Sequence, residues 1–184
     1  GLESHPGVTE CRSTAVVWPA PAATSTPARH RGFIRRMTSL LIHAAIGAFT
    51  VVLFFVFNAH LYRRDWPGSQ ATFLEGLYYA LAAVSVCIGW YFNQKYVFAY
   101  PEQASWMHFT KQLSDTPAGG SAAQDVIITN AILFPLWTII DGPRRGLRRA
   151  WLYFVMSLFT SFGFAMGLYL AAQERQLRWN ERSR

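Results

Sequence analysis

The side chains of this sequence that most readily bind a metal or a pigment are its histidines. His43 lies inside an uncharged, apolar run, and His60 follows just after the end of that run. The two are 17 residues apart, or about 25 Å along a helix, which is too far for both to ligate one metal ion. No other apolar run contains a histidine. Two helices of this chain therefore cannot hold a haem between a pair of histidines.

A chlorophyll is a different case, because its magnesium takes a single axial ligand from the protein. His43 is the first candidate for that ligand, and His60, Asn93 and His108 are weaker candidates. The simpler interpretation of His43 is a histidine that is hydrogen-bonded within a helix bundle or to a neighbouring subunit. We expect chlorophyll and carotenoid as cofactors, together with structural lipids, and no haem within this chain alone.

A second group of charged residues borders the apolar run at residues 126–140. Asp125 precedes the run and Asp141 follows it. The segment after Asp141 contains four arginines, Arg144, Arg145, Arg148 and Arg149. Guanidinium groups pair well with phosphates and carboxylates, so this loop can hold lipid phosphates or the acidic edge of a partner, with Asp141 paired to one arginine. The simpler interpretation is a positively charged loop that fixes the depth of the chain in a membrane.

The sequence lacks the motifs of the common enzyme chemistries. It contains no HExxH zinc motif, no GxxxxGK[ST] phosphate loop, no GxSxG nucleophile elbow and no CxxC pair. An intramembrane enzyme or a proton-relay transporter is expected to place ionisable groups within its spans. Three of the apolar runs, at residues 38–59, 76–94 and 150–173, have no Asp, Glu, Lys or Arg. We therefore expect a protein without enzyme activity.

Apolar helices must position these residues, and the sequence predicts four transmembrane spans. Their expected positions are about residues 38–59, 76–94, 120–140 and 150–173. A helix rises about 1.5 Å per residue and the hydrocarbon core is about 30 Å thick, so each stretch is long enough to cross. The third span would place Asp125 in its first turn, where a carboxylate meets the positive end of the helix dipole. Pro135 predicts a kink in it.

Four crossings place both termini on one side of the membrane. That side, with the loop between the second and third spans, carries eleven Lys and Arg residues, against six on the other side. The six lie in short loops, where positive charge counts most. The sequence therefore leaves the orientation open.

The predicted fold is all-α and integral to a membrane. Residues 1–36 are expected to form an extended Pro- and Arg-rich arm, residues 37–177 a four-helix transmembrane domain, and residues 178–184 a polar tail. Of the residues, 52% are hydrophobic and 15% charged, below the roughly 25% charged that is typical of soluble domains. The net charge of +7 comes from basic residues near the ends of apolar runs. This distribution argues against a nucleic-acid partner.

The loop at residues 99–122 carries Trp106 and other aromatic residues. They predict a short amphipathic segment on the membrane surface or against a partner. Small residues also recur at helical spacing in three of the predicted spans: Ala44 and Ala48, Ser85 and Gly89, and Gly163 and Gly167. Such spacing lets helices approach one another closely in lipid.

Several motifs follow one another between residues 81 and 177. They are GWYF at 89–92, DVIITNAILFPLW from 125, DGPRRG at 141–146, WLY at 151–153 and FAMGLYLAAQERQL at 164–177. In this order and spacing, the segment resembles an uncharacterised family of small three-helix membrane proteins from cyanobacteria and other bacteria. The resemblance implies a membrane domain without an established activity. The signature residues that it implies are Asp125, Asp141, Arg144, Arg145, Trp151, Glu174 and Arg175.

From these features we expect a non-catalytic accessory subunit of a large photosynthetic membrane complex, of the photosystem I–antenna type, in the chloroplast thylakoid. The chain starts with Gly rather than Met, which we interpret as a processed end. The spans would bridge larger membrane subunits, and the arm and the Trp106 loop would clamp neighbours. One alternative is a supernumerary subunit of a respiratory complex in the mitochondrial inner membrane. Another is a small transporter or lipid-binding membrane protein that uses Asp125 and the arginine loop.

Overall fold

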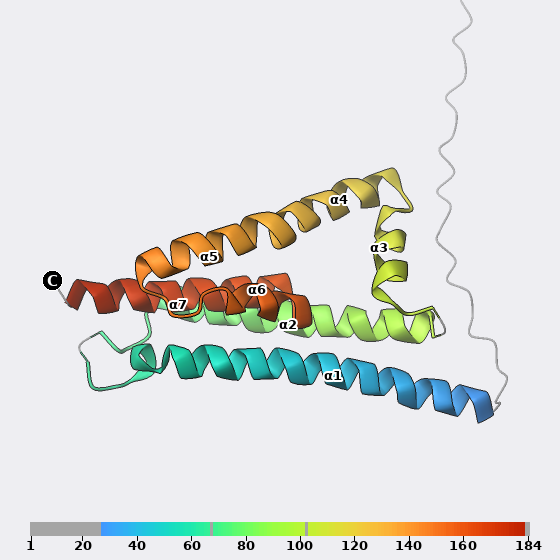
Figure 1. Ribbon diagram of the computed structural model, residues 1–184, viewed down its shortest axis with the longest axis horizontal. Helices are drawn as coiled ribbons and strands as arrows, with labels where there is room; N and C mark the ends of the chain where they lie inside the picture. Colours follow the sequence, from blue (N-terminus) through green and yellow to red (C-terminus); the bar gives the residue numbers. More distant parts are fainter. Residues whose placement is uncertain (1–26, 67, 102, 183–184) are drawn as a thin grey trace, which may run out of the picture.

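The computed structural model describes residues 27–66, 68–101 and 103–182, and all regular structure within them is helical. The elements in chain order are α1 (Pro27–Phe57), the 3-10 turn η1 (Ala59–Tyr62), α2 (Phe73–Ala99), α3 (Trp106–Ser114), α4 (Pro117–Ile127), the π-helical turn η2 (Ile128–Leu133), α5 (Phe134–Arg145), α6 (Leu152–Phe159) and α7 (Phe162–Arg182). In Figure 1, α3 crosses between the far ends of α2 and α4. The expectation of an all-α fold is confirmed.

The first helix starts earlier than the sequence predicts. We expect an extended arm over residues 1–36, but α1 begins at Pro27, so residues 27–36 are helical. Proline suits the first turn of a helix, because the N–H that it lacks would have no intrahelical acceptor there. The rest of the arm lies outside the described residues. At the other end of the chain, α7 continues to Arg182 and takes up most of the expected polar tail.

Two helical runs within the described residues are long and apolar enough to cross a membrane. One is α2, and the other is the continuous run of α4, η2 and α5 from Pro117 to Arg145. In α1, a shorter apolar stretch covers Leu41–Phe57. Within the described part of the chain, two helices are therefore long and apolar enough to cross a membrane, and the four spans that the sequence predicts are not confirmed.

The run from α4 to α5 changes its helical winding at η2. Pro135 is the second residue of α5, which follows η2 directly, and it has no N–H to donate to the preceding turn. The wider π-helical turn lies immediately before it, which accommodates the missing hydrogen bond without ending the helix. Because the helix starts at Pro117, Asp125 lies in its third turn. The expected position of Asp125 in the first turn is therefore wrong.

The predicted fourth span, residues 150–173, is not one helix. α6 ends at Phe159, Thr160 has the non-helical angles φ −121° and ψ −97°, and α7 begins at Phe162. The ring of Tyr153 in α6 packs edge to face on that of Tyr169 in α7, with centroids 5.0 Å apart. This contact shows that the chain reverses direction between the two helices. α6 and α7 therefore form a helical hairpin whose tip lies at residues 160–161.

Side-chain hydroxyl groups stabilise this break. Thr160 Oγ1 donates to the carbonyl of Met156 at 2.7 Å, where α6 ends. Ser161 Oγ accepts from the backbone N–H of Phe164 at 3.1 Å, where α7 begins. Such hydroxyl groups compete with the backbone ladder and satisfy groups that a helix end leaves unpaired. Neither proline nor glycine occupies residues 159–162.

The hairpin packs between α1 and α2 through small residues. A Cβ atom added to Gly167 would lie 2.9 Å from the carbonyl oxygen of Tyr78, and one added to Gly163 would lie 2.3 Å from Ser85 Oγ. A Cβ atom added to Gly47 of α1 would likewise lie too close to Thr160. The prediction of close helix approach at Gly163 and Gly167 is confirmed. The hairpin tip reaches the middle of α2.

The hydrophobic core lies at the end of the bundle where α6 begins and α7 ends, which we call the hairpin end. Its fully buried aromatic rings are those of Phe54, Tyr153 and Tyr169, and Phe134 is 2% exposed. At this end, the C-terminal end of α7 lies beside the loop after η1 and the turn between α5 and α6, as Figure 1 shows, whereas α1 starts at the opposite end. The hairpin thus places the start of α1 and the end of α7 at opposite ends, where four crossings would place them together.

Candidate functional site

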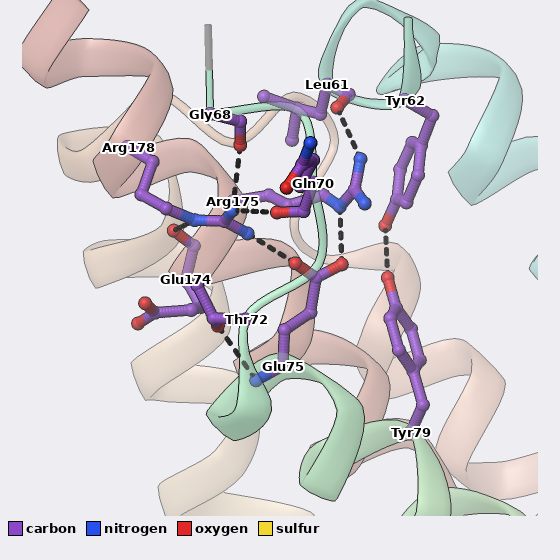
Figure 2. A network of polar contacts seen from close by, with 10 residues as sticks. All are labelled: Leu61, Tyr62, Gly68, Gln70, Thr72, Glu75, Tyr79, Glu174, Arg175 and Arg178. Atoms are coloured by element: carbon purple, nitrogen blue, oxygen red, sulfur yellow. Dashed lines mark hydrogen bonds and ion pairs between the residues drawn. The ribbon is translucent and has the colours of Figure 1, made fainter. Parts of the chain in front are cut away.

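The most deeply buried charge in the described part of the chain belongs to Glu75. Its side chain is 0% exposed, in the first turn of α2. One carboxylate oxygen accepts from Nε of Arg175 and the other from Nη2 of Arg178, both from α7. The side chains of the two arginines are themselves 11% and 16% exposed. Figure 2 shows the carboxylate facing both arginines.

The same arginines hold the segment between η1 and α2. Arg178 Nη1 donates to the carbonyls of Gly68 at 2.8 Å and Gln70 at 2.6 Å. Arg175 Nη1 donates to the carbonyl of Leu61 at 2.9 Å (Figure 2). Both oxygens of Glu75 are therefore used in ion pairs that also anchor a loop. This geometry makes the cluster a structural lock between α2 and α7, and it leaves no carboxylate oxygen open to a substrate.

Tyr62 and Tyr79 lie beside this lock. Tyr79 OH donates to Tyr62 OH at 3.2 Å, and the guanidinium of Arg175 lies 4.8 Å from the centre of the Tyr62 ring. Burial raises the pKa of Tyr62 well above its usual range. The hydroxyl therefore stays protonated and extends the hydrogen-bond network toward α1.

A second carboxylate joins α7 to α5. Asp141 Oδ2 accepts from Arg145 Nε at 2.6 Å, Trp137 Nε1 at 3.0 Å, Gln173 Nε2 at 3.2 Å and Tyr169 OH at 3.4 Å. The expected pairing of Asp141 with an arginine of the loop is thus present, within one helix and four residues apart. Hydrogen bonds to a charged group are stronger than those between neutral groups, so the bonds to Asp141 hold α7 against α5, on a different side from the Glu75 contacts.

A third contact holds the loop between α5 and α6. Asn58, 0% exposed, donates from Nδ2 to the carbonyl of Arg148 and accepts the N–H of Arg148 at Oδ1, each at 3.1 Å. The paired bonds fix the backbone of Arg148 and leave its side chain exposed. Arg144 and Arg149 are exposed as well, and the Arg149 guanidinium lies 5.8 Å from the Phe57 ring centre. Of the four predicted arginines, only Arg145 is drawn into an ion pair within the described residues.

The four candidate pigment ligands do not come together. His43 is half-buried in α1, and its ring packs 5.8 Å from that of Phe159 near the hairpin tip. His108 Nδ1 lies 2.8 Å from Tyr96 OH, in hydrogen-bonding contact. Asn93 is exposed on α2.

His60 lies at the other end of the bundle, in η1, with its ring 5.4 Å from that of Trp179. Burial, together with the charges of Arg148 and Arg63, lowers the pKa of His60 below its ordinary value of 6.5. The side chain of Gln176, close enough to His60 for a hydrogen bond, opposes this shift. Within the described residues, no three His, Cys, Asp or Glu side chains lie close enough to hold a metal ion.

Asp125 and Trp106 remain at the far end from the arginine loop. Asp125 is exposed and accepts from Gln124 Nε2 at 2.8 Å. It lies in α4, whereas the arginines follow Asp141 at the end of α5, so the structure does not bring the two groups together. Trp106 begins α3, a short helix where the sequence predicts an amphipathic segment.

Polar groups also meet at the hairpin tip, halfway along α2. Ser85 and Ser161 lie 3.1 Å apart, Oγ to Oγ. Ser157 Oγ donates to Asn130 Oδ1 at 3.0 Å, and Asn130 lies in the π-helical turn η2. π-helical turns and broken helices recur at functional sites of proteins. The tip is therefore a second candidate region.

Glu75 and its partner Arg178 are not among the site residues that the sequence predicts. Two signals point to them. Thr72 and Glu75 form a T-x-x-E capping box directly before an apolar run, and Thr72 Oγ1 accepts the N–H of Glu75 at 3.2 Å. Arg175 and Arg178 are three residues apart, so they share one face of a helix.

The family to which the chain belongs follows from comparison with known proteins. A family model described as "Protein of unknown function DUF2834" matches residues 77–175. No curated protein and no solved structure matches the chain. The matched segment runs from the first turns of α2 to Arg175, so it includes the Asp141 contacts, α6 and α7 as far as Arg175, whereas α1, Glu75 and the end of α7 lie outside it. The match covers more than half of the chain and confirms its resemblance to an uncharacterised family; the chain belongs to the DUF2834 family.

Proposed function

We propose that this chain is an integral membrane protein and a non-catalytic accessory subunit of a larger membrane complex. In this proposal α1, α2 and the run from α4 to α5 cross the bilayer, and the α6–α7 hairpin enters and leaves on one side. The proposal is supported mainly by two exposed stretches of the helix bundle, which no other described segment of the chain covers. Residues 90–95 of α2 and residues 124–129 of α4 and η2 are all exposed. Each stretch exceeds one helical turn, so among the described residues neither stretch has a side that is buried against another helix.

The ionisable groups support a structural role over a catalytic one. Glu75 is occupied by Arg175 and Arg178, and Asp141 is occupied by Arg145. An active site needs an acid, base or nucleophile within reach of a substrate. These carboxylates instead join α7 to its two neighbouring helices. A subunit that fills space between larger neighbours requires such rigid joints and uncovered apolar faces.

With the hairpin, the charges favour one orientation, which the sequence alone leaves open. Among the described residues, nine arginines lie at the hairpin end, and six Lys and Arg residues lie at the other end. Positive residues close to spans favour the cytoplasm, stroma or matrix side. We therefore propose that the hairpin end faces that side and that α1 starts on the opposite side.

The compartment remains a proposal from the sequence. A thylakoid complex of the photosystem I–antenna type comes first, and a mitochondrial respiratory complex is the alternative. Of the four candidate chlorophyll ligands, Asn93 has an exposed side chain, whereas His43, His60 and His108 each pack against other parts of this chain.

The test is isolation of the native assembly. Antibody capture of this chain from gently solubilised membranes is expected to recover larger membrane subunits in fixed ratio, and the absorption spectrum of that material separates the compartments. Chlorophyll bands indicate the photosynthetic complex, and haem bands without chlorophyll indicate the respiratory one. Recovery of the chain alone, at the size of a monomer, would contradict the proposal.

A second candidate function, a small transporter, is favoured by the polar hairpin tip. Non-helical backbone within a membrane is tolerated where it is buried in protein or lines a water-filled cavity. If the tip lines a pathway, Asn130→Ala and Ser161→Ala should change solute flux into proteoliposomes. If the hairpin tip has only a structural role, both variants should be less stable, and neither the variants nor the natural chain should transport solute.

A further inference from the structure

Two adjacent arginines, Arg148 and Arg149, are held in a fixed position at the end of α1. Asn58, the residue after α1, accepts the backbone N–H of Arg148 and donates to its carbonyl, each at 3.1 Å. On either side of the pair, Leu147 and Ala150 are buried in the hydrophobic core. Both arginine side chains are exposed. The fold therefore presents two positively charged side chains from an anchored turn.

The backbone of Arg149 has a conformation that residues other than glycine rarely adopt. Its φ is +53°, and no other non-glycine residue in the described part of the chain has a positive φ. Such a conformation is unfavourable, so it persists only where the surrounding structure imposes it, and it is frequent at functional sites. The Arg149 guanidinium lies 5.8 Å from the ring centre of Phe57, the last residue of α1. The turn thus places a guanidinium group directly at the end of this helix.

This end of α1 has an excess of positive charge. Two segments meet there, residues 58–72 and 142–151, and together they contain six arginines and one acidic residue, Asp65. Neither Arg148 nor Arg149 forms an ion pair within the described residues. Guanidinium groups bind phosphate and carboxylate oxygens strongly, so the pair is suited to an anionic ligand.

An exposed apolar strip on α1 leads to the same place. Its members recur at i, i+4, i+7, i+11 and i+15, so they share one face of the helix. They are Ile42, Ile46, Phe49, Leu53 and Phe57, of which Leu53 is half-buried and the others are exposed. Ile42 and Phe57 are 15 residues apart, or about 22 Å along a helix, which exceeds the roughly 15 Å of one leaflet of the hydrocarbon core. One acyl chain can therefore lie along the strip, with Arg149 at its end.

We propose that Arg148, Arg149 and this apolar strip bind an anionic phospholipid. The two guanidinium groups meet the phosphate, and one acyl chain covers the strip. A phospholipid fits this surface because it joins a negative group to a hydrocarbon chain, as the chain joins two unpaired arginines to an apolar face. The inference rests on the proposed membrane location and not on the accessory role.

A matched pair of variants tests the strip. Phe49 is an exposed residue midway along it, and Leu81 is an exposed apolar residue of α2 outside it. Phe49→Gln is expected to weaken binding of phosphatidylglycerol about threefold, because less apolar surface is covered. Leu81→Gln should leave it unchanged. Equal effects of the two substitutions would show that the acyl chain does not lie on this face of α1.

The main experiment measures lipid binding to the purified full chain by native mass spectrometry in an uncharged detergent. The probes are phosphatidylglycerol, phosphatidylcholine and glycerophosphoglycerol, which is the phosphatidylglycerol headgroup without acyl chains. We expect phosphatidylglycerol to bind about tenfold more tightly than phosphatidylcholine, because only the first carries a net negative charge. Glycerophosphoglycerol should bind much more weakly, because it cannot cover the strip. Equal binding of the two lipids, or equally tight binding of the headgroup alone, would overturn the proposal.

Charge variants test the two arginines. Arg149→Asn is expected to weaken phosphatidylglycerol binding about fivefold, and it should fold because asparagine tolerates a positive φ. Arg148→Gln should weaken binding by a similar factor, and it should fold because Asn58 bonds only the backbone of Arg148. Arg144→Gln is the matched control, an exposed arginine of α5, which lies across the α6–α7 hairpin from α1 (Figure 1). It removes the same charge and should change binding less than about twofold.

The other outcomes are separable. An equal loss in Arg144→Gln and Arg149→Asn would show a diffuse charge effect and refute the site. If the variants bound lipid normally but no longer captured neighbouring subunits from membranes, the arginines would meet an acidic protein surface instead, which also overturns the proposal. Lipid binding by a chain that is recovered from membranes as a monomer would leave this site intact and contradict only the accessory role.

Discussion

At the scale of single residues, the ion-paired carboxylates Glu75 and Asp141 hold α7 to its neighbouring helices. Glu75 is the most demanding case, because removing one partner of a buried ion pair leaves the others charged and unpaired. Glu75→Ala should lower the free energy of unfolding by about 3–5 kcal/mol. The measurement is reversible denaturation in mixed micelles. Glu181→Gln, an exposed site at the end of α7, is the control and should stay within about 0.5 kcal/mol. Similar losses in the two variants would contradict the lock.

His60 gives a dependence of stability on pH at the same scale. Its pKa is lowered in the folded state, mainly by burial and then by Arg148. The unfolded chain therefore takes up a proton at higher pH than the folded chain, and the stabilising effect of the neutral ring is lost as pH falls below 6.5. His60→Asn should show a flatter decline in unfolding midpoint below that pH. Parallel declines in the variant and the natural chain would show that His60 does not titrate in this way.

Sequence alone identifies Asp141 and its arginine loop, because a charge at the edge of an apolar run stands out. It does not identify the Glu75 lock, since the partners lie 100 and 103 residues away. Which of several helix-end arginines meets Glu75 depends on how α7 is folded back. That fold is a property of the elements.

At the scale of elements, the decisive feature is the break between α6 and α7. An uninterrupted apolar run of 24 residues at 150–173 predicts a span by length. Two adjacent hydroxyl residues end one helix and start the next, a weaker signal than proline or glycine. The small residues at 163 and 167 are read correctly from their spacing, because close approach requires them in either topology.

The packing of α7 on α2 gives a test of the hairpin. Gly167→Ala would place a Cβ atom 2.9 Å from both Tyr78 O and Ala82 Cβ, and overpacking of this kind costs about 1–3 kcal/mol. Gly76→Ala meets no atom within 4 Å and should be neutral or stabilising by up to about 1 kcal/mol. Thermal unfolding of the two variants side by side makes the comparison. If Gly167→Ala proved as stable as Gly76→Ala, the close contact between α7 and α2 would be absent.

At the scale of the whole molecule, the hairpin decides which ends of the chain share a side. The hydrophobic composition predicts an all-α protein with apolar helices, and that part follows from the sequence. The number of crossings does not follow, because a half-length hairpin and a full span have the same length of apolar chain. With the hairpin, the loop after η1, the turn between α5 and α6 and the end of α7 all lie together.

The most direct test of the account is cysteine labelling of this topology. Single cysteines at Ser69, Gln103 and Glu181, in a chain with Cys11 and Cys87 replaced by serine, are treated with a membrane-impermeant maleimide in sealed vesicles of known orientation. We expect the cysteines at positions 69 and 181 to be labelled from the same side and the cysteine at position 103 from the other. Labelling of positions 103 and 181 from one side, with 69 on the opposite side, would contradict the hairpin and restore four crossings.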